Sequence, residues 1–206
     1  MTRILIAGSL LLCSFTVAKD APWFSGKIMY HNSFKTLDGA DISDKVGPVF
    51  GIDDPYYISD GNYKMYTEKK QLVELYTAAS NQFQFFMNGQ PAQAIDAATG
   101  TPGVSKPLAQ TATIAGYPCQ SLQITNEADG ATTVYFYSSK LRVNPERFAK
   151  HTMGDFYTYL KASNGAVPLR IIMTNTKQGF TMTSEATSVQ AMPLTAADFT
   201  KDAPAR

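Results

Sequence analysis

The strongest constraint on the fold is a run of alternating segments, separated by tight turns, between Ala112 and Phe148. The stretch reads ATIAGYPCQSLQITNEADGATTVYFYSSKLRVNPERF. Alternation of apolar and polar residues predicts β-strands that bury one face. The predicted strands here are 111–115, 119–125 and 133–138. No residue in the stretch has the setting of a catalytic group, so it predicts an architecture rather than a chemistry.

The same alternation recurs through most of the chain. The further predicted strands are 24–30, 49–59, 63–66, 72–76, 83–87, 169–176 and 180–190. Asp60-Gly61-Asn62 predicts a hairpin turn, and Asn88-Gly89 predicts the end of the strand 83–87. Residues 36–45 are rich in Asp and Gly and are expected to form a loop. Residues 90–110 are expected to form a long connection with one short strand.

A helical pattern is predicted in one late segment, residues 145–162. Asn144 precedes Pro145, which is typical of a capped helix start. We expect two short helices broken near Gly154 and closed by Ser163-Asn164-Gly165. One side of these helices carries the candidate residues for contact with an apolar ligand or for a lid over it. They are Phe148, Phe156, Tyr159 and Leu160.

These elements predict a mainly β fold. About ten strands joined by short turns favour an antiparallel sheet that curls into an incomplete β-barrel. Period-2 strands leave one apolar face that needs cover, and the 145–162 helices are the natural cover for the concave face. If the cover is a lid, Gly154 would serve as its hinge.

The N-terminus has the features of a secretory signal peptide. Arg3 gives a positive start, residues 4–17 are apolar or small, and Thr16 and Ala18 predict cleavage after Ala18. Cys13 follows Leu12, whereas a lipidation site prefers Gly, Ala or Ser before the cysteine. We therefore expect residues 1–18 to be removed and 19–206 to form a single β domain in the periplasm or at the periphery of the outer membrane.

Composition limits the possible partners. The chain has 18 Lys and Arg against 17 Asp and Glu, and the loss of Arg3 makes these counts equal. Nucleic acid or an anionic membrane surface would require an excess of basic residues. No second apolar run is long enough for a transmembrane helix. The sequence indicates no cofactor.

Candidate catalytic and metal sites are weak. Neither His31 nor His151 accompanies a nucleophile motif, and no zinc motif occurs, so we expect no catalytic and no metal residue. We interpret His31 as a solvated rim residue and Cys119 as a buried, reduced thiol. One acidic group could bind Ca²⁺, but its spacing favours a solvated loop: Asp38, Asp41, Asp44, Asp53 and Asp54.

The 112–148 stretch also carries a family resemblance. Its turn and strand residues resemble a group of secreted bacterial proteins at Gly116, Tyr117, Cys119, Tyr137, Ser138, Leu141, Val143, Pro145 and Phe148. The opening strand 24–30 and the closing Leu194 and Phe199 fit the same group. Such proteins are similar in layout to the periplasmic lipoprotein-carrier and outer-membrane lipoprotein-sorting superfamily (LolA/LolB-like). The resemblance implies a curled sheet whose concave apolar face can shelter acyl chains.

Two functions remain open from the sequence. The first is a non-enzymatic carrier or binding protein for a lipid, an acyl chain or another apolar ligand. The second is a structural or protein-interaction module of the cell envelope, with an envelope protein as partner and a filled core. A continuous apolar cavity of several hundred Å³ would favour the carrier, and a filled interior would favour the module.

Overall fold

The computed structural model describes residues 23–87 and 89–205. The predicted signal peptide lies outside the described residues, together with Arg3, Cys13 and the cleavage site after Ala18. Asn88 of the predicted Asn88-Gly89 turn also lies outside them.

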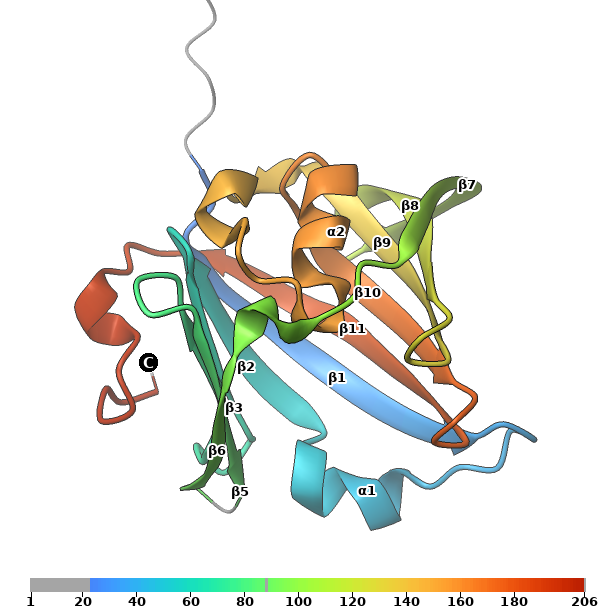
Figure 1. Ribbon diagram of the computed structural model, residues 1–206, viewed down its shortest axis with the longest axis horizontal. Coiled ribbons are helices and arrows are strands. Elements are labelled where there is room, and N and C mark those ends of the chain that lie inside the picture. The colour runs from blue at the N-terminus through green and yellow to red at the C-terminus, as the bar shows by residue number, and fades with distance from the viewer. Residues whose placement is uncertain (1–22, 88, 206) are drawn as a thin grey trace, which may run out of the picture.

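The described chain forms one antiparallel sheet that does not close into a barrel (Figure 1). Its eleven strands are β1 (Gly26–Thr36), β2 (Asp53–Ser59), β3 (Asn62–Tyr66), β4 (Leu72–Thr77), β5 (Gln82–Met87), β6 (Gln90–Asp96), β7 (Val104–Ile114), β8 (Tyr117–Asn126), β9 (Ala131–Arg142), β10 (Ala166–Asn175) and β11 (Phe180–Ala191). The predicted mainly β, curled antiparallel fold is confirmed.

The strand order is β6-β5-β4-β3-β2-β1-β11-β10-β9-β8-β7. Strands that are consecutive in the chain are neighbours in the sheet, except for β6 and β7, and the first and last strands, β1 and β11, pair at its centre. There Ile28 of β1 lies opposite Val189 of β11 and Tyr56 of β2. Strands β6 and β7 are the two edges, so residues 97–103, here called the crossing segment, must run from one edge to the other. Figure 1 shows this green segment passing across the concave side, with η1 (Ala97–Thr99) near its start.

The predicted helices cover one end of the concave face (Figure 1). They are η2 (Pro145–Phe148), η3 (Met153–Asp155) and α2 (Phe156–Ala162). The Asn144 side chain caps η2 by accepting a hydrogen bond from the backbone N–H of Glu146 at 3.1 Å. The break at Gly154 is confirmed, because its φ of 61° is not helical. The Gly165 N–H closes α2 by donating to the carbonyl oxygen of Leu160 at 2.7 Å.

One helix was not predicted. The expected loop 36–45 and the expected strand from residue 49 are wrong in part, because α1 (Ser43–Phe50) lies between β1 and β2. The sequence gives no helical signal here because α1 contains Gly47 and Pro48, and both residues have low helix propensity. Contacts with β1 hold the helix instead: the Phe34 N–H donates to Ser43 Oγ at 3.0 Å, and the rings of Phe50 and Phe34 lie 6.1 Å apart.

The expected long connection at residues 90–110 is also wrong, because it contains β6 and most of β7. Both are edge strands whose side chains are mostly exposed. An exposed strand has no buried face and so lacks the alternation that predicts strands elsewhere. Pro91 and Pro107 lower the strand signal further, although proline is tolerated at a sheet edge.

The C-terminal segment packs on the opposite, convex face of the sheet. It contains η4 (Ala196–Asp198), and the following Phe199 is buried against Tyr57, Tyr66 and Leu75, with Leu194 beside them. The Tyr66 hydroxyl donates to the carbonyl oxygen of Ala203 at 2.6 Å. The convex face of β2–β5 is therefore filled core. No helix in residues 23–87 or 89–205 is long and apolar enough to cross a membrane.

Candidate functional site

A group of stacked rings joins the helices to β3 and β4. The Phe156 ring lies 5.1 Å from Tyr63 and 4.5 Å from His151, and His151 lies 4.3 Å from Tyr76. The Tyr63 hydroxyl and His151 Nε2 are 2.8 Å apart and hydrogen bonded. Burial lowers the pKa of His151 to about 4, so the ring is neutral near pH 7. These contacts make His151 part of the support for the helices.

Below this ring group lies a cavity of about 700 Å³ on the concave side of the sheet. The helices form its roof, and β1–β4 and β9–β11 form its walls. Exposed residues of α1 and of the β8–β9 and β10–β11 turns also border the cavity, so its mouth lies at the end away from α2. Phe50 of α1 stands at this mouth, 6.1 Å from the ring of Phe34.

Most of the wall is apolar or aromatic. Rings come from β1–β3 and β9, and aliphatic and thioether groups come from β2 and β3 on one side and from β10 and β11 on the other. The principal apolar groups are Tyr30, Phe34, Tyr56, Ile58, Tyr63, Met65, Ile171, Met173 and Met182. A concave, mainly apolar space with a few polar groups is the usual form of a small-molecule site.

Glu74 is a carboxyl group set into this wall. It lies in β4, opposite Met65 of β3 and Phe85 of β5. The residue borders the cavity and has no hydrogen bond or ion pair with another described residue. Burial raises the pKa of its carboxyl group to about 7. A lone carboxyl group between two apolar neighbours is a feature that packing alone does not explain.

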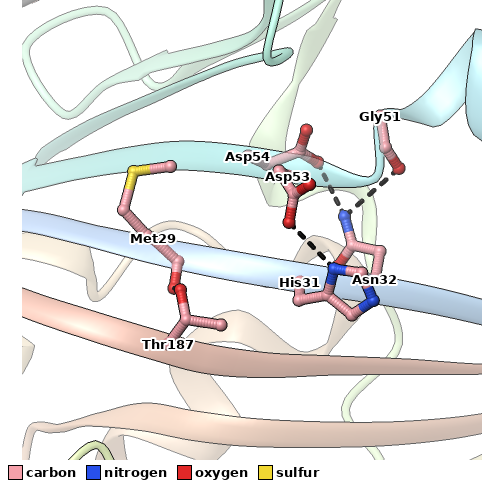
Figure 2. A network of polar contacts seen from close by, with 7 residues as sticks. All are labelled: Met29, His31, Asn32, Gly51, Asp53, Asp54 and Thr187. Carbon is pink, nitrogen blue, oxygen red and sulfur yellow. Dashed lines mark hydrogen bonds and ion pairs between the residues drawn. The ribbon is translucent and has the colours of Figure 1, made fainter.

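Asp54 of β2 is a second carboxyl group at the cavity (Figure 2). It is fully buried, and Asn32 Nδ2 donates to its Oδ2 at 2.7 Å and to the carbonyl oxygen of Gly51 at 3.4 Å. Burial raises the pKa of Asp54 to about 7, despite the hydrogen bond from Asn32, which acts in the opposite direction. Gly51 has a φ of 88°, and a Cβ there would collide with the Asp54 carboxyl group. This network fastens the end of α1, and with it Phe50, to β1 and β2.

The four residues predicted as ligand or lid contacts divide into two groups. Phe156, Tyr159 and Leu160 border the cavity from the roof. Phe148 does not border it; the side chain is fully buried behind the roof, 5.3 Å from Phe156 and 6.1 Å from Tyr76. Contact of the first three with a ligand stays a prediction.

The predicted solvated acidic group is wrong for Asp54, which is buried on the concave face of β2 while Asp53 points outward. The strand pleat explains the difference, because adjacent side chains point to opposite faces. Asp38, Asp41 and Asp44 are exposed as predicted. In the part of the chain that the structure describes, no three acidic, His or Cys residues are grouped to hold a metal ion.

His31 is exposed, as predicted, on the outer face of β1. Its Nδ1 lies 2.8 Å from Asp53 Oδ1, with half of each side chain open to solvent (Figure 2). An exposed pair of this kind contributes little to stability.

Cys119 is buried in β8 and is in no disulfide among the described residues. Burial raises the pKa of its thiol, which suppresses the reactive thiolate. We expect a thiol reagent to label native protein slowly and unfolded protein at once, and Cys119→Ala to change stability modestly. Rapid quantitative labelling of the native protein would contradict this prediction.

Three features of the site were not predicted. Phe50 was missed with its helix, and the partners of Asp54 depend on contacts distant in sequence. Glu74, however, left a signal, since it is the one charge in the apolar strand Leu72-Val73-Glu74-Leu75-Tyr76.

Comparison with models of known protein families gives no match, and no curated protein matches the chain by sequence. Solved structures do match. Two crystal structures of PNGF-II match 84% and 85% of this chain at 14% identity, with TM-scores of 0.48 and 0.49. The match covers 29% of the PNGF-II chain, so this protein spans less than a third of its length.

Two further structures match over nearly their whole length. A LolA superfamily protein from Nitrosomonas europaea matches at 15% identity and a TM-score of 0.38, over 88% of this chain and 92% of the other. A putative outer membrane lipoprotein-sorting protein domain from Vibrio parahaemolyticus matches at 13% identity and a TM-score of 0.29, over 89% and 92%. The superfamily that the sequence resembles is thus found again among the solved structures, and these matches identify no ligand.

Proposed function

We propose that the protein is a non-enzymatic carrier or binding protein that holds a lipid, an acyl chain or another apolar ligand in the concave cavity. The observation that supports the proposal is the cavity itself, about 700 Å³ in volume and walled mainly by apolar side chains. Ligand pockets in proteins commonly have volumes of about 300–1,000 Å³.

The cavity favours the carrier over the alternative, a structural or interaction module with a filled core. Protein interiors are packed as densely as organic crystals, and an apolar void costs stability in proportion to its size. The convex side of the same sheet is filled by Phe199 and its neighbours, so the chain has the means to fill a face. The concave side keeps an open cavity instead, and a ligand site requires such a space.

The roof has the features of an adjustable cover. Phe156, Tyr159 and Leu160 follow directly on the break at Gly154. A change at this hinge would shift the three residues together relative to the sheet. At the other end, Phe50 is 47% exposed and presents an apolar ring where a ligand would enter.

The proposed location is the periplasm or the periphery of the outer membrane. The predicted signal peptide supports export, and a carrier of apolar ligands has a role between two membranes. N-terminal sequencing of exported protein tests this location, with Lys19 as the expected first residue.

Filling the cavity is expected to abolish ligand binding. Met173 and Met182 face each other across β10 and β11 and both border the cavity. The double variant Met173→Trp, Met182→Trp should reduce the binding of N-phenyl-1-naphthylamine, a neutral apolar probe, by about tenfold or more, because indole rings would occupy its space. Fluorescence titration measures the change.

The matched control is Ile172→Trp, Thr183→Trp. These residues form the next pair in the same register and point to the opposite face. The control adds the same two indoles and should bind the probe as the parent does. Equal binding by both variants, or the absence of bound lipid in native mass spectrometry of protein from its own periplasm, would count against the proposal.

A further inference from the structure

The cavity wall carries negative charge without a visible counterpart. Glu74 has no hydrogen bond or ion pair with another described residue, and one oxygen of Asp54 has no hydrogen-bond partner among them. The two groups are near enough for the charge of Glu74 to contribute to the raised pKa of Asp54. The charge of Glu74 therefore opposes the ionisation of Asp54 in a site where burial already raises the pKa of both carboxyl groups.

The other charged residues around the cavity do not balance these two. Asp155 already accepts hydrogen bonds from the Gly103 N–H at 2.6 Å and from Asn126 Nδ2 at 3.0 Å. Lys177 is exposed in the β10–β11 turn and donates to the carbonyl oxygen of Ala128 at 2.6 Å. The single cation among the described lining residues thus stands at the mouth, far along the chain and the sheet from β4.

We propose that the cavity selects its ligand by charge, accepting amphiphiles whose polar end carries an ammonium group and disfavouring those that end in a carboxylate. This inference rests on the proposed function. Glu74 is the group that would pair with the ammonium, with Asp54 adding to the attraction. A buried carboxylate without a partner is costly, and a ligand cation removes that cost, whereas a ligand carboxylate increases it.

Charge selection is measured with three competitors that share one dodecyl chain: dodecylammonium, dodecanol and dodecanoate. Each displaces N-phenyl-1-naphthylamine from the protein below its micellar concentration. At about pH 8 both wall carboxyl groups are mainly ionised, since each has a pKa of about 7. We expect dodecylammonium to compete at least about tenfold better than dodecanoate, with dodecanol between them.

Glu74→Gln should reduce this ratio severalfold, and the part of the preference that remains is the contribution of Asp54. The matched control is Asp202→Asn, which removes the same charge from an exposed site in the C-terminal segment and should leave the ratio intact. The ratio in the parent protein decides the question even if Glu74→Gln does not fold.

The failures of the two proposals are distinguishable. Equal competition by the three dodecyl compounds in the parent would overturn charge selection and leave the carrier proposal standing. An unchanged ratio in Glu74→Gln would overturn the role of Glu74. Failure of the parent to bind the probe or any dodecyl compound would overturn both proposals.

Discussion

Phe148→Ala is expected to lower the free energy of unfolding by about 3–5 kcal/mol, the usual loss for a fully packed phenylalanine. Phe148 is completely buried, and its ring packs against Tyr76 and Phe156. Its removal would leave a void behind the roof, on the side away from the cavity, that the stacked rings cannot close without losing contact with each other. Denaturation by urea at constant m-value measures the loss.

Phe156→Ala is the matched comparison. Its ring is only partly buried and one side borders the cavity, so less packing is lost and we expect a smaller decrease in stability. Retention of the apolar probe should weaken, because Phe156 belongs to the wall. A full core-sized loss with unchanged retention would show that the helices are only a structural cover, and the proposed lid would be wrong.

The second large effect is a dependence of stability on pH that comes from Asp54. Its pKa is about 7 in the folded protein and about 3.9 in an unfolded chain. The folded state therefore binds the proton more tightly, and the stability due to the protonated carboxyl is lost as pH rises through the folded pKa. As the pH rises from about 5 to about 8, we expect the free energy of unfolding of the parent to fall by about 2–3 kcal/mol more than that of Asp54→Asn.

The comparison with Asp54→Asn is needed because His151 acts in the opposite direction. Its pKa is lowered to about 4 by burial, so its contribution is lost as pH falls rather than as it rises. Asn at position 54 keeps an oxygen for Asn32 and removes only the titration. A pH-independent difference between parent and variant, measured by chemical denaturation, would contradict the raised pKa of Asp54.

The sequence predicted the parts of the fold that bury one side of a strand. Strands β8, β9, β10 and β11 were found because half of their residues face the core. The edge strand β6 and the first part of β7 bury almost nothing, so no period-2 pattern marks them, and only the end of β7 was predicted, as the strand 111–115. Helix α1 contains Gly47 and Pro48, and it is held by tertiary contacts rather than by helix propensity.

The site was predictable only where a local pattern carries it. The helical stripe with Phe156, Tyr159 and Leu160 is local, and the structure places it over the cavity. The same stripe could not distinguish Phe148, which is buried behind the roof, from the three residues that border the cavity. That distinction depends on how the helices pack against the sheet. The Asp54 network joins residues from two strands and a helix end, and its assembly is a property of the folded chain.

The pairing of β1 with β11 has a consequence for the order of folding. The first and last strands meet at the centre of the sheet, so the strands made first form only one half of it. Until β11 arrives, the inner edge of β1 has unpaired backbone groups of the kind that invites association with other chains. Closing a contact between such distant segments is slow, because the entropy of a long loop is lost before the contact is gained. The concave face also has no roof at that stage, since η2, η3 and α2 belong to the second half. Pocket and sheet are therefore completed by the same late event, and a partly made chain has no site in which to hold a ligand.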